Sequence, residues 1–272
     1  MSSFENKIVL ITGGASGIGL RMGQRALELG AEALIIWDVS ETNIARAKEH
    51  LQKYDDAVHT HHVDIARPEQ IQDAAQKVHS DFGGVDILFN NAGIITGKHF
   101  NKQQPGEIQQ TIDINLTGAM HVTNAFLPDM IEQQSGHIVN IASAAGLVAN
   151  PGMAVYAASK WGLVGWSESL RIELEHHHPG LHITTVQPGY IDTGMFAGVT
   201  PPLLTPLLDP AEISEAIIGA VQKNIIVLRK PFMVKLIPFL KGILPTRLFD
   251  FVAGKLFKVY STMDSFTGRN AE

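Results

Sequence analysis

The sequence contains 272 residues with a formal net charge of −6; hydrophobic residues make up 45% and charged residues 18%. This composition excludes a disordered chain, and the acidic balance argues against a nucleic-acid partner. Because there is no cysteine, disulfides and thiolate metal sites are excluded, which fits a reducing compartment. The chain shows no export signal at residues 1–7 and no apolar run of membrane-spanning length, so we expect a soluble, cytoplasmic protein.

Short apolar runs alternate along the chain with segments of helical period. The runs rich in β-branched residues predict seven strands, at residues 7–12, 33–38, 58–63, 85–90, 137–142, 182–187 and 225–228. Helices are expected at residues 41–54, 68–82, 107–133, 154–177 and 210–223. This alternation predicts an α/β fold, a Rossmann-type doubly wound parallel sheet of about seven strands. We see no linker or repeat and expect a single domain, with residues 1–228 as its cofactor-binding catalytic part and residues 229–272 as a helical C-terminal extension.

A glycine-rich stretch, T-G-G-A-S-G-I-G at residues 12–19, directly follows the first predicted strand and opens a helical segment. Glycines let the backbone turn tightly and let a pyrophosphate approach it, and the helix N-terminus offers free N–H groups to that anion. A turn without chemical meaning is the alternative. The strand before it and the helix after it favour a dinucleotide site that includes Gly13, Ser16, Gly17, Ile18 and Gly19.

Asp38 ends the second predicted strand. A carboxylate at this position can accept hydrogen bonds from the ribose hydroxyls of the adenosine, and it would repel a 2′-phosphate. No arginine or lysine stands at positions 16, 39 or 40 to receive such a phosphate. The alternative is an aspartate that merely caps the next turn. We expect NAD rather than NADP as the cofactor.

Tyr156 and Lys160 stand four residues apart in a predicted helix, so both project from one face. The charge of a nearby lysine stabilises phenolate and thereby lowers the pKa of a tyrosine. Such a tyrosine can take a proton from an alcohol or give one to a carbonyl oxygen. A surface tyrosine beside a solvated lysine would show the same spacing, so the assignment depends on the residues that accompany the pair.

Further polar motifs follow the predicted strands in order. They are Asn90-Asn91-Ala92-Gly93 after the fourth strand, Asn115 in the next helix, Ser143 after the fifth strand, and Pro188-Gly189 with Thr193 after the sixth. With the glycine-rich stretch and the Tyr156–Lys160 pair, this series resembles the short-chain dehydrogenase/reductase family across residues 7–228. The resemblance implies a nicotinamide cofactor and the interconversion of an alcohol and a carbonyl by hydride transfer.

The resemblance also implies a role for each matching residue. Ser143 would hydrogen-bond the substrate oxygen, and Tyr156 would be the general base in oxidation or the general acid in reduction. Lys160 would hold the nicotinamide ribose and tune Tyr156, and Asn115 would anchor a water molecule in the proton relay. The remaining cofactor contacts would be Asp64 and Ile65 at the adenine, Asn91 and Gly93 at the adenosine side and ribose, and Ile191 and Thr193 at the nicotinamide.

Twelve histidines raise the question of a metal site. His59, His61 and His62 fall on a predicted strand, and residues 176–178 form a triplet at a helix end. With no cysteine and no carboxylate–histidine spacing of a known site, we expect no bound metal. The triplet is expected to face solvent, where cations suit a helix C-terminus.

The segment after Thr193 is rich in Phe, Met, Leu and Pro. In the family that the chain resembles, this segment forms a lid over the substrate, and its prolines exclude a long regular helix. Its apolar side chains predict a cover for a lipophilic substrate. An apolar loop that packs for stability alone would have the same composition.

The chain beyond residue 228 departs from the common ending of the family. Its apolar, basic segments at 230–240 and 243–245 and its close at 263–269, together with Trp37-Asp38 and the stretch at 143–146, resemble the retinol and hydroxysteroid branch of the family. Members of that branch act on bulky lipid alcohols and ketones, commonly at membranes. The resemblance therefore implies a lipophilic substrate.

Residues 229–260 carry seven basic side chains and one acidic one, a net charge of +6, which leaves −12 for the rest of the chain. One interpretation is an interfacial anchor for peripheral contact with a membrane. The other is a wall of the substrate pocket or a subunit contact, whose lysines extend to water. We favour the second, because Pro238 and Pro245 are expected to break the helix that an anchor prefers.

These observations favour an NAD-dependent dehydrogenase of a lipophilic secondary or allylic alcohol, such as a retinoid, a steroid or a long-chain alcohol. The alternatives are an enzyme of small carbonyls or alcohols and a non-catalytic NAD-binding regulator, which would usually have lost part of the catalytic set. Members of the resembled family are commonly dimers or tetramers through the helices that bear Asn115 and Tyr156. We therefore expect a homodimer or homotetramer.

Overall fold

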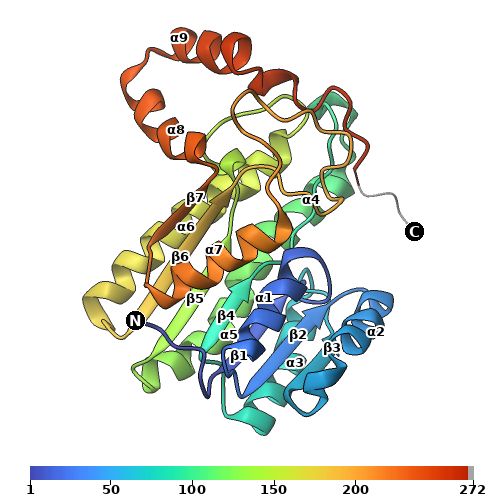
Figure 1. Cartoon of the computed structure of the whole chain (residues 1–272), viewed down its shortest axis with the longest axis vertical. Coiled ribbons are helices and arrows are strands. Elements are labelled where there is room, and N and C mark those ends of the chain that lie inside the picture. The colour runs from blue at the N-terminus through green and yellow to red at the C-terminus, as the bar shows by residue number, and fades with distance from the viewer. Residues whose placement is uncertain (269–272) are drawn as a thin grey trace.

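The structure is a computed structural model that describes residues 1–268, and a parallel seven-stranded sheet forms its centre (Figure 1). The strand order is β3-β2-β1-β4-β5-β6-β7. The strands are β1 (Ile8–Thr12), β2 (Ala33–Asp38), β3 (Val58–His62), β4 (Ile87–Asn90), β5 (Gly136–Ile141), β6 (Leu181–Pro188) and β7 (Val227–Lys230). Every strand starts and ends within two residues of its predicted bounds. The predicted α/β fold is confirmed.

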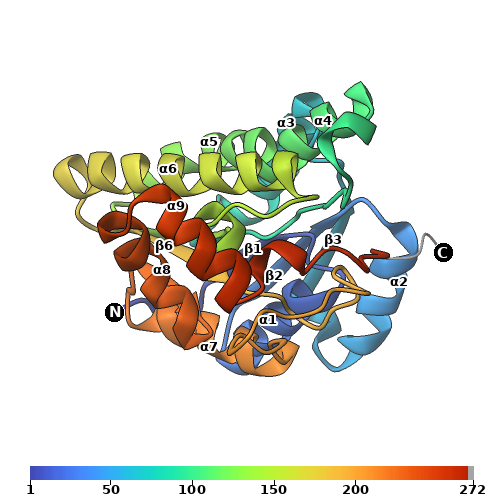
Figure 2. The ribbon, with the colours of Figure 1, turned by 90° about the horizontal axis from the view of Figure 1, so that it is seen from above.

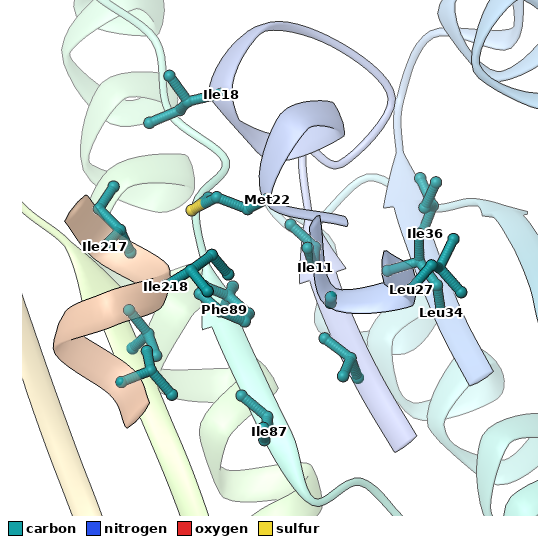
Figure 3. Close-up of a cluster of buried hydrophobic side chains, with 14 of the residues drawn as sticks. Ile11, Ile18, Met22, Leu27, Leu34, Ile36, Ile87, Phe89, Ile217 and Ile218 are labelled. Atoms are coloured by element: carbon teal, nitrogen blue, oxygen red, sulfur yellow. The ribbon is translucent and has the colours of Figure 1, made fainter. Parts of the chain in front are cut away.

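Helices cover both faces of the sheet (Figure 2). One face carries α1 (Gly17–Glu28), α2 (Glu41–His50) and α7 (Pro210–Gln222), and the other carries α3 (Pro68–Phe82), α5 (Gly118–Glu132) and α6 (Ala154–His177). On the first face, Ile11 and Ile36 of the strands belong to the same buried cluster as Met22 of α1 and Ile218 of α7 (Figure 3). Because helices bury both faces, the strands are continuous apolar runs rather than alternating ones.

The chain reverses its winding between β1 and β4, which are neighbours in the sheet. Thr12 and Asn91 join the carboxyl ends of these two strands. The Thr12 hydroxyl accepts hydrogen bonds from the backbone N–H groups of Asn91 (3.0 Å) and Ala92 (3.1 Å). The Asn91 side chain donates to the carbonyl oxygens of Thr12 (3.0 Å) and Gly13 (2.9 Å). Ligands of doubly wound sheets bind in the crevice at this reversal point.

The helix predicted over residues 107–133 is interrupted. It consists of α4 (Pro105–Ile112), a π-helical turn at Asp113–Thr117 and then α5. A π turn widens the helix locally and often lies at a functional position. Asn115 stands in this turn and is only 1% exposed. The interruption therefore places a predicted site residue in the interior.

The C-terminal extension leaves the sheet after β7 and projects beyond the carboxyl ends of the strands (Figure 1). It forms α8 (Phe232–Ile243), α9 (Thr246–Phe251), a π-helical turn at Val252–Leu256 and a 3₁₀ turn at Val259–Ser261. Residues 269–272 of the predicted extension lie outside the described residues. Within residues 1–268, no helix has both the length and the apolar character needed to cross a bilayer.

The prediction that Pro238 breaks the helix of the extension is wrong, because α8 runs through this residue. A proline in a helix removes one hydrogen bond, here to the carbonyl oxygen of Val234. Val234 is 2% exposed, and Ile237 and Leu240 pack against the cluster of the buried Phe249, so burial of the inner side of α8 as a whole offsets that loss. Pro245 does stand at the end of α8, at the N-cap of α9.

The buried His137 on β5 makes folding stability depend on pH. It is 1% exposed, and its ring nitrogens lie 2.9 Å from the Ser2 hydroxyl and 2.8 Å from that of Thr184. Burial lowers the pKa of His137 from 6.5 to about 3, with smaller contributions from His182 and the N-terminal charge. The unfolded chain binds the proton more readily, so this contribution to stability is present above pH 6.5 and is lost as the pH falls toward 3.

We predict that His137→Gln, which keeps hydrogen-bonding groups but cannot take up a proton, weakens this dependence. Between pH 7 and pH 5 its free energy of unfolding should fall by about 2 kcal/mol less than that of the wild type. Urea unfolding at both pH values measures the difference, with the exposed His50→Gln as the matched control. Equal pH dependence in wild type and His137→Gln would contradict the prediction.

Candidate active site

A cavity with about 1310 Å³ of free space lies at the carboxyl ends of the strands. Ser143, Tyr156 and Lys160 line it, and so do all the predicted cofactor residues except Gly19. Those lining cofactor residues are Gly13, Ser16, Gly17, Ile18, Asp38, Asp64, Ile65, Asn91, Gly93, Tyr156, Lys160, Ile191 and Thr193. The fold therefore brings residues from the whole predicted motif series to one cavity.

The glycine-rich loop forms a tight turn at one wall of this cavity. Gly17 has a φ of +56°, which favours glycine. Gly19 lies behind the wall, where a Cβ atom would be 2.4 Å from the carbonyl oxygen of Gly13. Ser16 stands at the N-cap of α1, and its side chain accepts no hydrogen bond from the helix. The first N–H groups of α1 are thus free to bind an anion, and the pyrophosphate of a dinucleotide fits this cradle.

Asp38 lies between the glycine-rich loop and the turn after β2. Its carboxylate accepts hydrogen bonds from the backbone N–H groups of Ala15 (3.1 Å) and Ser40 (3.0 Å). The sequence left two interpretations of this aspartate, a cap of the next turn and a carboxylate of the cofactor site. The structure shows it capping the turn and also lining the cavity. Among the described residues that line this cavity, Lys160 is the only lysine or arginine.

Tyr156 is buried in α6 with 5% of its surface exposed. The Phe196 ring stands edge-on to it, with centroids 6.2 Å apart. Burial raises the pKa of Tyr156 to about 12, Tyr190 adds to the rise, and the Ser143 hydroxyl opposes it. Ser143 is held at the end of β5, where its hydroxyl also accepts a hydrogen bond from the N–H of Ala145 (3.1 Å). The free protein therefore holds Tyr156 protonated at neutral pH.

Lys160 is 4% exposed and lies one helical turn after Tyr156. Its ammonium donates a hydrogen bond to the carbonyl oxygen of Ile141 (2.8 Å) and lies 5.8 Å from the centroid of the Tyr156 ring. Burial lowers the pKa of Lys160 from 10.5 to about 8. At pH 7 most of this lysine is still charged, so it opposes protonation of the neighbouring phenolate.

Asn115 does not line the cavity but supports its wall. Its side-chain amide accepts a hydrogen bond from the N–H of Ile94 (2.8 Å) and donates to the carbonyl oxygen of Ile94 (2.9 Å) and the Ser159 hydroxyl (3.1 Å). Ile94 belongs to the cavity wall, and Ser159 lies next to Lys160 in α6. Asn115 thus joins the loop after β4 to the helix of Tyr156. Its predicted role as a water anchor stays a prediction.

A second cavity, with about 930 Å³ of free space, meets the first at Ser143, Gly189 and Phe196, which line both. Most of its lining side chains are apolar. The C-terminal extension contributes Met233, Val234, Ile237, Leu240, Phe249, Val252, Ala253, Phe257 and Val259. The extension therefore forms a wall of this cavity, which is one of the two interpretations that the sequence left open.

The predicted lid segment also lines the apolar cavity, through Phe196, Pro202 and Leu203. Backbone hydrogen bonds tie it to the extension, from Thr200 to Thr262 (3.1 Å) and from Leu203 to Phe257 (3.0 Å). Lid and extension thus form one continuous cover on the apolar cavity.

A buried polar cluster joins this cover to the catalytic loops. The Asn150 side chain donates hydrogen bonds to the hydroxyls of Tyr190 (2.9 Å) and Thr262 (2.6 Å), which lie 2.8 Å apart. These residues come from the loop after Ser143, the end of β6 and the extension. Because each is buried or half-buried, the cluster fixes the extension against the site.

Sequence reasoning missed Asn150 and Tyr190 as lining residues of the apolar cavity. Tyr190 directly follows Pro188-Gly189, and that adjacency was a usable signal. Asn150 carries no such signal, because it reaches the cavity only through contacts between segments distant in sequence. Among the described residues, no group of three or more His, Cys, Asp or Glu side chains could hold a metal ion.

The sequence profile of the short chain dehydrogenases matches residues 7–203. The chain belongs to the short-chain dehydrogenase family. Mouse epidermal retinol dehydrogenase 2 is 37% identical over 97% of this chain and 86% of its own length. Rat estradiol 17-beta-dehydrogenase 11 is 32% identical over 91% of this chain and 83% of its own length. The predicted family and its retinol and hydroxysteroid branch are confirmed, and the protein is an oxidoreductase of the alcohol dehydrogenase type.

Solved structures show the same fold. A family member from Burkholderia phymatum in complex with NAD has a TM-score of 0.79 and 24% identity, and the match covers 93% of this chain and 96% of that one. A short chain dehydrogenase from Burkholderia cenocepacia in complex with NADP has a TM-score of 0.76 and 25% identity, covering 93% and 98%. A nicotinamide dinucleotide is the class of cofactor that fits this site.

We predict that Lys160→Met stabilises the fold while it removes catalysis. The shift in the pKa of Lys160 from 10.5 to about 8 corresponds to a destabilisation of about 3 kcal/mol at pH 7. Losing the hydrogen bond to Ile141 costs about 1 kcal/mol, so the free energy of unfolding should rise by about 2 kcal/mol. Urea unfolding at pH 7 measures the change.

The gain should shrink as the pH rises from 8 to 10.5, because over this range the folded wild type has released the proton that the unfolded chain still binds, and each rise in pH therefore stabilises the folded wild type. Lys77→Met, on the exposed face of α3, is the matched control and should change the free energy of unfolding by less than about 0.5 kcal/mol. A Lys160→Met variant less stable than the wild type at pH 7 would show that the lysine is not a buried charge.

Proposed function

We propose that the protein is an NAD-dependent dehydrogenase that interconverts a lipophilic alcohol, of retinoid, steroid or long-chain type, and its carbonyl compound. One observation carries this proposal: the cofactor cavity and the apolar cavity meet at Ser143, Gly189 and Phe196, beside the buried Tyr156. A substrate in the apolar cavity would thus bring its oxygen to Ser143 and Tyr156.

A nicotinamide cofactor held in this cavity would supply the hydride chemistry of the proposed reaction. The Ser143 hydroxyl hydrogen-bonds the substrate oxygen and holds it near the Tyr156 hydroxyl. In oxidation the Tyr156 phenolate takes the proton of the alcohol, and in reduction the phenol returns it to the carbonyl oxygen. The Lys160 ammonium stabilises the phenolate and so favours deprotonation of Tyr156, against the burial that raises its pKa to about 12.

The other assigned residues bind the cofactor in this proposal. The glycine-rich loop and the N-terminus of α1 hold the pyrophosphate. Asp64 and Ile65 contact the adenine, Asn91 and Gly93 the adenosine side, and Ile191 and Thr193 the nicotinamide end. All six line the cavity at the carboxyl ends of the strands, which supports these assignments.

The preference for NAD rests on Asp38. Its carboxylate is held at the cavity wall by Ala15 and Ser40, where it would accept hydrogen bonds from the adenosine ribose and repel a 2′-phosphate. The absence of an arginine among the described residues of that wall supports the same choice.

We predict that Asp38→Asn lowers kcat/KM for NAD by about ten-fold, because a charged hydrogen-bond acceptor for the ribose is lost. The ratio of kcat/KM for NADP to that for NAD should rise, since the repulsion of the 2′-phosphate is also lost. Steady-state rates with each cofactor measure both changes. Glu41→Gln, an exposed carboxylate at the start of α2, is the matched control. An unchanged ratio in Asp38→Asn would exclude this residue as the selector.

The lipophilic substrate rests on the lining of the second cavity. Its walls are largely apolar and come from the lid and the C-terminal extension. The similar proteins from mouse and rat are named retinol and estradiol dehydrogenases, which agrees with that chemistry. An enzyme of small carbonyls or alcohols is the alternative, and a non-catalytic NAD-binding regulator would be expected to lack part of the intact set of Ser143, Tyr156 and Lys160.

We predict that the wild type reduces NAD with retinol, steroid alcohols or long-chain alcohols, and that Tyr156→Phe lowers kcat by about a thousand-fold. Binding of NAD, measured by fluorescence titration, should be preserved in that variant. The rate of oxidation by the wild type should increase with pH, because deprotonation of Tyr156, with a pKa of about 12 in the free protein, is required. The absorbance of NADH follows the reaction.

Each outcome of this experiment separates the candidate functions. Turnover on small secondary alcohols alone would contradict the lipophilic substrate but keep the enzyme. NAD binding without turnover of any substrate, in either direction, would favour the non-catalytic regulator. A fully active Tyr156→Phe would contradict the proton-transfer role.

We also propose that the protein is a homodimer or homotetramer through α5 and α6. Part of α6 is covered by the extension, since the Lys241 ammonium lies 4.0 Å from the centroid of the Trp161 ring. The free part of α6 includes the exposed Ile172. The contact between subunits would use this part.

A further inference from the structure

The C-terminal extension has two apolar sides. One side forms the wall of the apolar cavity. The other side faces outward and carries Phe232, Phe239, Ile243, Leu248, Phe251 and Leu256, which we name the outer apolar face. Phe232 and Phe239 are 66% and 64% exposed. Monomeric soluble proteins rarely leave a group of large apolar side chains so exposed.

The two sides of α8 follow from the helical period. Phe232, Phe239 and Ile243 are seven and four residues apart, so they lie on one stripe. Val234 and Ile237, which line the cavity, lie on a different stripe. Burial of the inner stripe explains how α8 packs onto the protein. Within residues 1–268, this packing leaves the side chains of the outer stripe exposed to solvent.

Basic side chains border the outer apolar face. Lys235 and Lys255 are exposed beside Phe232 and Leu256, and the side chain of Arg247 is 98% exposed. The segment 229–260 carries +6, whereas the rest of the chain carries −12. A surface that combines exposed apolar side chains with an excess of lysine and arginine is typical of segments that lie in the interface of anionic membranes.

The positive charge beside the outer apolar face favours an anionic bilayer over a second copy of the chain as its binding partner. A symmetric contact between two copies of this face would bring the exposed Lys235, Arg247 and Lys255 of one copy against those of the other, which opposes association. An anionic bilayer offers negative headgroups to the lysines and hydrocarbon to the phenylalanines. Figure 1 shows α8 and α9 at the outside of the molecule, beyond the end of the sheet. They are therefore accessible to a planar surface.

We infer that the outer apolar face is a docking surface for an anionic lipid bilayer. Docking places the apolar cavity, which the inner side of the same helices lines, directly above the membrane in which lipophilic compounds dissolve. The inference concerns binding and does not depend on turnover. Its failure would leave the proposed function untouched.

The test is flotation of the full-length protein with vesicles of phosphatidylcholine and phosphatidylserine, beside vesicles of phosphatidylcholine alone. The wild type should float with the anionic vesicles and less so in high salt, since lysine–headgroup attraction is screened. The double variant Lys235→Gln/Lys255→Gln should bind anionic vesicles about ten-fold more weakly. The double variant Phe232→Ser/Phe239→Ser should bind them more weakly at every salt concentration.

Phe100→Ser, which replaces a 63% exposed phenylalanine outside the C-terminal extension, is the matched control and should float like the wild type. Thermal unfolding of each variant verifies that weaker flotation does not reflect loss of folding. Wild-type protein that floats with neither kind of vesicle would overturn the inference. It would also be overturned if the phenylalanine variants float normally but lose a dimer in analytical ultracentrifugation, since a second copy would then cover this face.

Discussion

The hydrogen bonds between Thr12 and Asn91 join the two strands between which the chain reverses direction. To one side of this joint the chain winds through β2 and β3, and to the other through β5, β6 and β7. The joint keeps the glycine-rich loop beside the loop after β4, so one crevice receives side chains from both halves of the sheet. The adenosine and nicotinamide ends of the proposed cofactor site are thereby brought into a single cavity.

Tyr156 and Lys160, the proposed catalytic pair, are buried and held in place by their surroundings. Burial raises the pKa of Tyr156 and lowers that of Lys160, so both shifts disfavour the charged forms that the proposed reaction needs, and the shift of Lys160 opposes folding at neutral pH. Hydrogen bonds keep the pair in position: Lys160 reaches the Ile141 carbonyl oxygen, and Asn115 ties the neighbouring Ser159 to the loop after β4. The free-energy cost of burying this charge is offset by the apolar core on both faces of the sheet.

The C-terminal extension serves the apolar cavity and the outer surface at once. An apolar helix with one buried side is stable on a soluble protein, and a second apolar side is costly in water unless a partner covers it. The cluster of Asn150, Tyr190 and Thr262 fixes the extension to the catalytic loops. The helices that carry the outer apolar face therefore also form the wall of the cavity in which the substrate is proposed to bind.

The sequence by itself determined the seven strands, the α/β fold and the motif series, because strand periodicity, glycine turns and polar residues at strand ends are local properties of the chain. It also named Ser143, Tyr156 and Lys160 as site residues, and the structure brings all three to one cavity. The tertiary structure decided which residues line the apolar cavity, why α8 continues through Pro238, and that Asn115 supports the wall rather than lining it. These depend on packing between distant segments, because the inner side of α8 is buried at the apolar cavity and no local pattern of the sequence records those contacts.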